Sequence, residues 1–439
     1  MHNQKPAIKS QATNLKKIGK SSCFQLFLLF ALTTPANAVD LKLTAPDGSS
    51  SDYFGTSVAI SDNKALIGSY GDDDNGSSSG SAYLFDTTTG SLLHKFTAPD
   101  GSAGDLFGIS VALSDNIALV GSYKDDDNGT DSGSAYLFDT TTGSLLQKFT
   151  APDGSADDLF GISVALSNNI ALVGSYLDDD KGSRSGSAYL FDTTTGSLLH
   201  KFTAPDGSAS DQFGVSVALS NNTVLIGSHY DDDEGLQSGS AYLFDTTTGN
   251  LLHKFTAPDG SANDRFGRSV ALSDNTALIA SFFDDDNGID SGSAYLFDTT
   301  TGSLLHKFTA PDGSANDRFG RSAVALNNNT ALIGSYLDDD NGTDSGSAYL
   351  FDTTTGSLLH KFTAPDGSAN DRFGLSVALS NNTALIGSNL DDDNGTNSGS
   401  AYLFTTNTNT KSTPEPSSLL GIVGTVAIAF LSLKKQQNK

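Results

Sequence analysis

The residues of this 439-residue chain best suited to chemistry are runs of three aspartates that recur every 53 or 54 positions, as in "YKDDDNGTDSGSAYLFD" at 123–139. Along an extended backbone the first and third side chains of such a run point the same way, about 6.5–7 Å apart at Cα. Two carboxylates and a backbone carbonyl can surround a hard cation such as Ca²⁺, which extracellular modules bind at about 10⁻⁴–10⁻³ M. The candidate metal ligands are therefore the first and third aspartates of the seven runs: Asp72, Asp74, Asp125, Asp127, Asp178, Asp180, Asp231, Asp233, Asp284, Asp286, Asp338, Asp340, Asp391 and Asp393.

The same runs are also typical of solvated turns, because Asp, Asn and Gly are the residues that turns favour. If the glycine after each run is aligned with the sixth position of a calcium-binding loop, Lys124, Leu177 or Tyr230 falls at the first position, where a carboxylate is needed. The sequence therefore leaves two interpretations open: a calcium site and a metal-free acidic turn. It indicates no other cofactor.

Groups that could act in acid–base or nucleophilic catalysis are repeated, whereas an active site needs an asymmetric set. Five histidines share one position of the repeat: His94, His200, His253, His306 and His360. His229 stands where other copies have Tyr or Phe, which favours packing over catalysis. The segment 76–80, "GSSSG", has the letters of a nucleophile elbow but not its strand–helix context. We expect a protein that is not an enzyme, and the alternative is a hydrolase or lyase that acts on polysaccharide.

The elements that must position these residues form a tandem repeat, marked by Phe-Gly pairs that begin at positions 54, 107, 160, 213, 266, 319 and 373. Each unit contains four short runs rich in β-forming residues and separated by turn residues. In the second unit these runs span 109–114, 117–123, 134–139 and 145–151. Four antiparallel strands in each of seven units are the pattern of a β-propeller. The predicted fold is all-β, a seven-bladed propeller of four-stranded blades.

The repeat starts and stops part-way through a unit. Residues 41–48 match a fourth strand with its following loop, and the last unit stops after its third strand, at 401–404. We expect these two segments to pair and close the ring, which removes two free sheet edges. The sixth unit carries one extra residue in "RSAVALNNN", which predicts a β-bulge or a longer turn.

Two loops of each unit are expected on the same face of the ring. The triplet loop joins the second and third strands and carries the three aspartates, and the Phe-Gly loop runs from the fourth strand to the next Phe-Gly pair. Forty of the 51 acidic residues fall in these loops. The sequence therefore predicts one strongly acidic face.

Three features of each unit resemble FG-GAP repeats, the units of the integrin α-subunit propeller and of many bacterial surface proteins. They are the Phe-Gly pair, the glycine that ends the second strand and a Gly-x-Ala-Tyr-x-Phe third strand. The resemblance covers about residues 41–404 and implies an adhesion-like role. Gly-Ser-Tyr at 121–123 stands where the family name has Gly-Ala-Pro. The family's Asp-x-Asp-x-Asp-Gly calcium loop between the first two strands is absent from this sequence, so none of its ligands carries over.

The two ends of the chain have the composition of export signals. Residues 1–38 combine a lysine-bearing start, the apolar run "FQLFLLFAL" and Ala-Asn-Ala at 36–38, as in a secretory signal peptide. Pro-Glu-Pro at 414–416, an apolar run at 419–433 and two lysines resemble the PEP-CTERM sorting signal of Gram-negative bacteria, which implies an exosortase-like processing enzyme. A plain membrane anchor is the alternative. The expected parts are a signal peptide (1–38), the propeller (39–405), a linker (406–418) and a sorting or anchor segment (419–439).

Charge limits the classes of partner. Residues 39–410 carry 50 acidic and 16 basic side chains, a balance that repels nucleic acid and anionic membranes and attracts cations. The single cysteine, Cys23, lies before the propeller, so no disulfide framework is expected there. We expect an exported binding or scaffold module at the cell envelope or in the extracellular matrix of a Gram-negative-type bacterium. Its expected partner is a glycan or a matrix or surface protein, with membrane contact only through the C-terminal segment.

Overall fold

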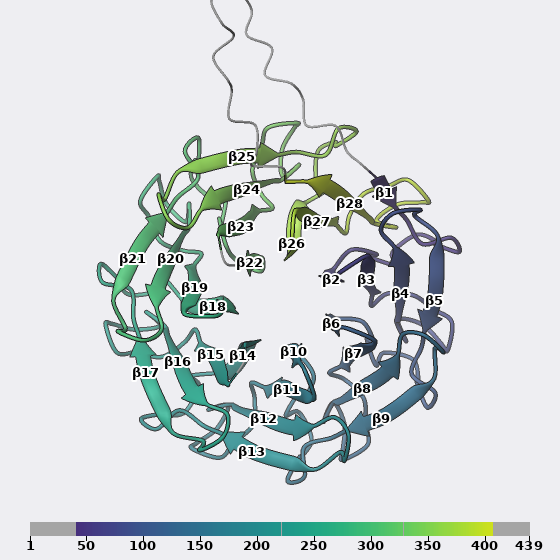
Figure 1. The fold of residues 1–439 in the computed structure, drawn as a ribbon, viewed down its shortest axis with the longest axis horizontal. Coiled ribbons are helices and arrows are strands. Elements are labelled where there is room, and N and C mark those ends of the chain that lie inside the picture. Colours follow the sequence, from purple (N-terminus) through teal and green to yellow (C-terminus); the bar gives the residue numbers. More distant parts are fainter. Residues whose placement is uncertain (1–40, 221, 328, 407–439) are drawn as a thin grey trace, which may run out of the picture. The chain divides into compact units, whose positions relative to one another are not determined.

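The computed structural model describes residues 41–220, 222–327 and 329–406, and these form seven four-stranded antiparallel sheets. The sheets stand as blades around a central channel (Figure 1), which confirms the predicted seven-bladed β-propeller. Within the described residues there is no helix of the length and apolarity needed to cross a membrane. The predicted signal peptide and the sorting or anchor segment lie outside the described residues.

In the first three blades the strands follow one another from the channel to the outer rim. Blade 1 contains β2 (Ser57–Ser61), β3 (Lys64–Ser69), β4 (Ser81–Asp86) and β5 (Leu92–Phe96). Blade 2 contains β6 (Ser110–Ser114), β7 (Ile117–Ser122), β8 (Ser134–Asp139) and β9 (Leu145–Phe149), close to the four ranges predicted for this unit. Blade 3 contains β10 (Val164–Ser167), β11 (Ile170–Ser175), β12 (Ser187–Asp192) and β13 (Leu198–Phe202).

The next three blades repeat this order. Blade 4 contains β14 (Phe213–Ser220), β15 (Thr223–Ser228), β16 (Ser240–Asp245) and β17 (Leu251–Phe255). Blade 5 contains β18 (Phe266–Ser273), β19 (Thr276–Ser281), β20 (Ser293–Asp298) and β21 (Leu304–Phe308). Blade 6 contains β22 (Val324–Leu326), β23 (Thr330–Ser335), β24 (Ser347–Asp352) and β25 (Leu358–Phe362).

Blade 7 closes the ring with strands from both ends of the repeat. It contains β26 (Phe373–Ser380), β27 (Thr383–Ser388) and β28 (Ser400–Thr405), and its outer strand is β1 (Leu41–Leu43). Leu41 lies opposite Leu403 and Leu43 lies opposite Ala401 in an antiparallel pairing. The predicted closure is confirmed.

The core lies between neighbouring blades. The two middle strands of each blade are buried on both faces, because a blade on either side covers them. One apolar cluster joins Leu84 of blade 1 to Phe107, Val120 and Phe138 of blade 2. The phenylalanine of each Phe-Gly pair is fully buried in such a cluster. Because each unit repeats the same apolar residues, each pair of neighbouring blades encloses a similar buried apolar layer.

Neighbouring blades approach closely at the glycine near the end of the second strand. A Cβ built on Gly227 would lie 1.9 Å from the carbonyl oxygen of Gly267 in the next blade. Only a residue without a Cβ fits such a contact, and the other blades repeat it with one exception. In blade 5 the position is occupied by Ala280, whose side chain is fully buried.

The extra residue of the sixth unit lies close after Gly320, whose Cβ position is 2.7 Å from the Cβ of Ala280. Val324 pairs with Ile333 as Val270 pairs with Ile279 in blade 5, so the residue is inserted between Gly320 and Val324. Of the two expectations, a β-bulge and a longer turn, the pairing of β22 with β23 shows no register shift, and the extra residue lengthens the turn segment that leads into the inner strand. The Cβ position of Gly320 is 3.6 Å from the nearest carbonyl oxygen, against 2.3 Å for Gly267. The insertion thus displaces Gly320, which makes room for the methyl group of Ala280.

Candidate functional site

The triplet loops and the Phe-Gly loops meet on one face of the ring, as predicted. In blade 1 the triplet loop accepts backbone hydrogen bonds from the following Phe-Gly loop: Gly104 N–H donates to Ser77 C=O at 2.9 Å and Phe107 N–H donates to Ser79 C=O at 3.0 Å. Because these contacts tie the two loops together, their carboxylates converge.

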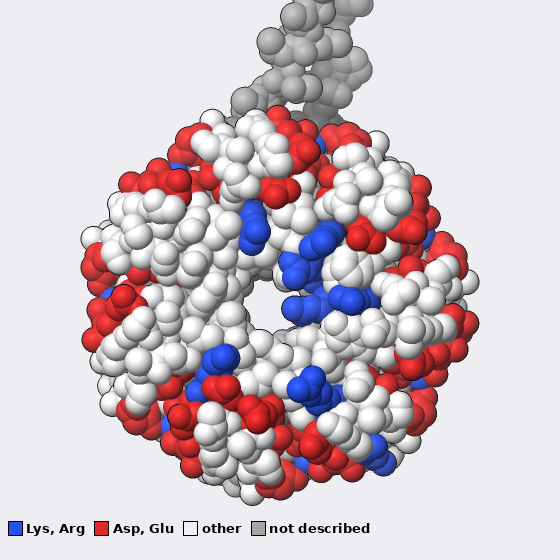
Figure 2. Space-filling view, turned by 180° about the vertical axis from the view of Figure 1, so that it is seen from behind, with Lys and Arg blue, Asp and Glu red and all other residues white. Residues whose placement is uncertain are grey.

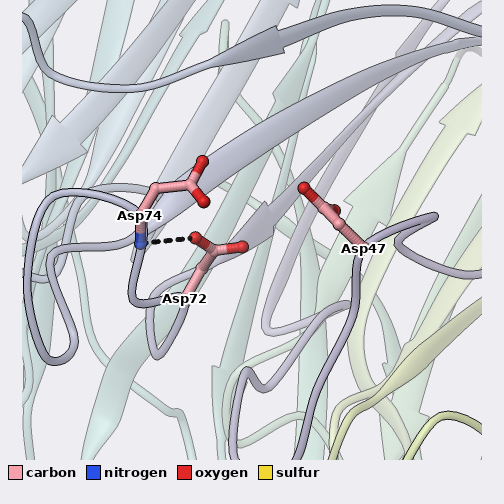
Figure 3. Close-up of side chains that lie close together, drawn as sticks. All are labelled: Asp47, Asp72 and Asp74. Atoms are coloured by element: carbon pink, nitrogen blue, oxygen red, sulfur yellow. Dashed lines mark hydrogen bonds between the residues drawn. The ribbon is translucent and has the colours of Figure 1, made fainter.

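Three carboxylates lie together in each blade, two of them predicted. In blade 1 they are Asp72 and Asp74 of the triplet loop after β3 and Asp47 of the Phe-Gly loop after β1 (Figure 3). The backbone N–H of Asp74 donates to Asp72 Oδ1 at 3.1 Å, which turns both side chains of the run toward Asp47. One oxygen of each carboxylate lies within 4.8 Å of the others, an arrangement that could hold a metal ion. Asp100, Asp125 and Asp127 form the same group in the next blade.

A lysine ammonium lies among these carboxylates. Lys95 of the outer strand β5 places Nζ 2.7 Å from Asp47, 3.2 Å from Asp72 and 2.5 Å from Asp74. The hydroxyl of Tyr83, from β4, lies 2.6 Å from Asp72 and 2.9 Å from Asp47. We call this set of three aspartates, one lysine and one tyrosine the acidic pocket. The seven lysines of the seven pockets are Lys42, Lys95, Lys148, Lys201, Lys254, Lys307 and Lys361.

The electrostatics of the pocket fix the protonation of its members. Burial alone would raise the pKa of Asp47, but hydrogen bonds from Lys95 and Tyr83 hold it below its ordinary value. Burial alone would lower the pKa of Lys95, but its contacts with Asp47, Asp74 and Asp72 raise it. Burial and then the hydrogen bond to Asp72 raise the pKa of Tyr83. At neutral pH the lysine is therefore charged, the tyrosine is neutral, and both donate hydrogen bonds.

The structure places the predicted metal ligands at two depths. The first aspartate of each run is buried, with Asp72 4% exposed, and the third lies at the surface in contact with the pocket lysine. The middle aspartate shapes the loop, since Asp73 accepts the N–H of Ser78 at 2.7 Å. Sequence analysis missed the third carboxylate, the lysine and the tyrosine. Their repetition in "TAPDG", "HKF" and "AYLF" was the available signal.

A second buried carboxylate lies beside each pocket. Asp52 is 3% exposed and accepts the N–H of Ser49 at 2.6 Å, while Ser69 Oγ donates to its backbone carbonyl. Burial raises the pKa of Asp52, and nearby triplet aspartates add to the effect. At three equivalent positions, Asp158, Asp264 and Asp371, burial raises the pKa to about 6.

The channel forms a cavity of about 380 Å³ lined by the inner strands of all seven blades. Serines such as Ser216 and Ser269 line it, together with Arg268. His229 is buried and packs against Tyr230, with 4.1 Å between ring centroids, in agreement with the packing role expected of it. Figure 2 shows basic side chains gathered on one side of the central opening, with acidic side chains farther out. Sequence analysis did not foresee this basic group within the acidic face.

The comparisons with known proteins agree with this architecture. The FG-GAP repeat model matches seven times, at residues 40–85, 91–138, 144–191, 197–244, 250–297, 303–351 and 357–404. No match was found among the curated proteins. Each match ends at the third strand of a blade and begins near the fourth strand of the blade before it. Because the matches cover well over half of the chain, the protein belongs to the FG-GAP repeat family.

Proposed function

We propose that this protein is an exported, adhesion-like binding module that presents the face of its triplet and Phe-Gly loops to a glycan or to a matrix or surface protein. The observation that carries the proposal is the continuity of this face, because fourteen loops from seven blades are joined by repeated backbone hydrogen bonds. Such a surface is rigid and charged, and it can position many contacts at once. The FG-GAP family and its surface proteins support the same role by analogy.

Calcium would compete with the pocket lysines for the carboxylate oxygens of the acidic pockets. Three carboxylates and one ammonium leave each pocket with a net negative charge, and two of the three carboxylates, Asp47 and Asp74, are about half exposed. Millimolar calcium could replace the ammonium at these oxygens, in the affinity range of extracellular modules. Calcium would then stabilise the loops of this face and would not act as a catalytic cofactor.

A glycan and matrix-protein array probed with the purified protein, with and without calcium, tests the binding function. We expect a discrete set of retained partners, with binding stronger in calcium. No retained partner under either condition would contradict the proposal. Shortening of a bound polysaccharide would replace it with the hydrolase or lyase alternative.

Export is supported by the signal-like composition of residues 1–38 and by the sorting-like segment at 414–439. We propose a mature protein that begins at Val39 and is processed near Pro-Glu-Pro by an exosortase-like enzyme at the envelope of a Gram-negative-type bacterium. Mass spectrometry of the surface fraction tests this. An intact Met1 end would contradict export through a cleaved signal, and an intact Lys439 end would leave only the plain anchor.

A further inference from the structure

Five of the six arginines of the chain lie in three adjacent repeats, around the "DRFG" segments that lead into the inner strands of blades 5, 6 and 7. They are Arg265, Arg268, Arg318, Arg321 and Arg372, and we call them the arginine cluster. Arg268 lines the channel, and basic side chains border one side of its mouth (Figure 2). This is an asymmetric feature in a protein that is otherwise repetitive.

Within the part of the chain that the structure describes, no carboxylate pairs with the arginine cluster. Among the described residues none of its five guanidinium groups forms an ion pair, whereas the seven pocket lysines all do. Aromatic faces hold the guanidiniums instead. Arg265 lies 4.8 Å from the ring centroid of Tyr230 and 4.6 Å from that of Phe283, and Arg321 lies 5.3 Å from that of Tyr336. Such contacts orient a guanidinium but leave its charge uncompensated.

Several polar atoms beside the cluster lack hydrogen-bond partners. The Nε atoms of Arg265, Arg318 and Arg372 are buried and unpartnered. His229 is 5% exposed and its Nδ1 has no partner either. Burial, followed by the charges of Arg268 and Arg265, holds the pKa of His229 well below its ordinary value, so the ring is neutral at pH 7. Unsatisfied buried polar groups are uncommon in folded proteins, and water, an ion or another bound ligand can satisfy them.

The members of the cluster also repel one another. Burial and then the charge of Arg321 lower the pKa of Arg268 to about 10. An anion bound among these groups would relieve the repulsion and accept their free hydrogen bonds. Guanidinium groups bind carboxylates in a bidentate manner, with two parallel hydrogen bonds.

We propose that the arginine cluster at the channel mouth binds a carboxylate-bearing sugar, a uronic acid residue presented alone or at a chain end. The carboxylate would pair with the guanidiniums. The hydroxyl groups of the sugar would meet the channel serines, of which Ser216 has a buried, unpartnered Oγ, and the sugar ring would lie against the exposed parts of the aromatic residues. The acidic loops around the mouth repel a long polyanion, which favours a ligand with a single carboxylate at the site. This inference rests on the proposed binding function and names a ligand class for it.

Calorimetric titration of the full-length chain with glucuronate in low-chloride buffer tests the inference. We expect saturable binding of glucuronate, and weaker binding of glucose and inorganic phosphate at equal ionic strength. Arg268→Gln should weaken glucuronate binding at least about tenfold, because it removes a hydrogen bond between two charged groups. Lys64→Gln is the matched control, because it removes one positive charge beside Asn116 and Thr140, away from the channel mouth, and should leave the affinity unchanged.

Thermal unfolding without ligand and binding of a longer saccharide complete the test. Without ligand, Arg268→Gln should melt no lower than the parent, because it removes a repelling charge, and Arg372→Gln serves as a second variant if the first does not fold. A neutral oligosaccharide that ends in one uronic acid should bind like the monomer if a chain end is the natural source, and an oligouronate should bind more weakly because the acidic loops repel its additional carboxylates. Equal binding of phosphate and glucuronate, or an Arg268→Gln variant with parental affinity, would overturn the inference. If glucuronate does not bind but the array retains partners, the uronic acid inference fails and the proposed binding function stands. If the array also retains no partner, both fail.

Discussion

At the scale of single residues, the lysine of each acidic pocket does what a bound cation would do. Lys148 contacts Asp100, Asp125 and Asp127 in blade 2. Lys148→Met keeps most of the side-chain stem and removes the charge, so three carboxylates are left to repel one another. We expect the Tm to fall by about 2–5 °C, because the pocket is partly buried. Millimolar calcium should restore more of this loss than sodium chloride at equal ionic strength, because calcium coordinates the carboxylates as well as screening them.

The matched control is Lys124→Met, since Lys124 is a more exposed lysine on the triplet loop whose nearest carboxylate, Asp131, is 3.9 Å away. Its Tm should change by less than about 1 °C. Adding Asp125→Asn and Asp127→Asn to the Lys148→Met variant should abolish the increase in Tm that calcium produces. Equal effects of calcium and sodium chloride in every variant would show that the pockets are neutralised by lysine alone and bind no metal.

At the scale of elements, Ala280 and the extra residue of blade 6 should be energetically coupled. Deleting Ala323 gives blade 6 the regular repeat length, which should return Gly320 toward the close position that Gly267 occupies against Gly227. The methyl group of Ala280 would then overlap Gly320. We expect the deletion to lower the free energy of unfolding by about 2 kcal/mol or more, and Ala280→Gly in the same chain to recover much of that loss. Urea unfolding of the four chains forms the double-mutant cycle.

Gly227→Ala is the control for this cycle, because it places a Cβ 1.9 Å from the Gly267 carbonyl oxygen with no inserted residue to relieve it. It should be destabilising by at least as much as the deletion. Additive effects of Ala280→Gly and the deletion would contradict the coupling, and the alanine would then be accommodated by some other displacement.

The strand pattern was predictable because it is local, whereas the contents of the site depend on contacts between distant segments. Alternating apolar residues and turn residues indicate the strands in any one unit, and the unpaired fourth strand at 41–48 indicates closure. The pocket joins Lys95 to Asp47, 48 residues earlier, through a geometry that only the assembled blade creates. Arg265 and Arg268 are visible in the sequence, but the overall excess of acidic over basic residues does not indicate that arginines gather at one place. Only the structure shows that neither guanidinium forms an ion pair with a carboxylate of the described residues.

At the scale of the whole molecule, seven copies of one buried carboxylate should give the ring an unusual pH dependence. The group consists of Asp52, Asp105, Asp158, Asp211, Asp264, Asp317 and Asp371, all with raised pKa values. Where the folded pKa is raised, the folded chain binds more protons than the unfolded chain, so stability falls as pH rises from about 4 to 6. We expect the Tm to rise by about 2–5 °C when pH is lowered from 7 to 5.

Below about pH 4 the trend should reverse. The pocket carboxylates equivalent to Asp47 have lowered pKa values in the folded protein. They therefore stabilise the fold at pH values above the pKa of the unfolded chain, and this stabilisation is lost as the pH falls through the pKa of the folded chain. Calorimetric scans from pH 3 to 8 in 0.5 M sodium chloride measure both limbs while screening general charge repulsion. Asp264→Asn should reduce the rise in Tm between pH 7 and 5 slightly, because it removes one of the seven buried carboxylates. A Tm that stays level between pH 7 and 5 would refute the raised pKa values.

The way in which the ring closes also governs how its gene can change length. The closing pair joins a fourth strand from the start of the repeat, β1, to a third strand at its end, β28. Unequal crossing-over between near-identical units in the middle leaves both partners of that pair intact, and it adds or removes one whole blade with its acidic pocket. Units 5 to 7 are less interchangeable, because Ala280 needs the insertion of the following unit and the arginine cluster draws on three neighbours. We therefore expect duplication or loss of a blade to be best tolerated among blades 1 to 3, which contain neither the inserted residue nor the arginine cluster.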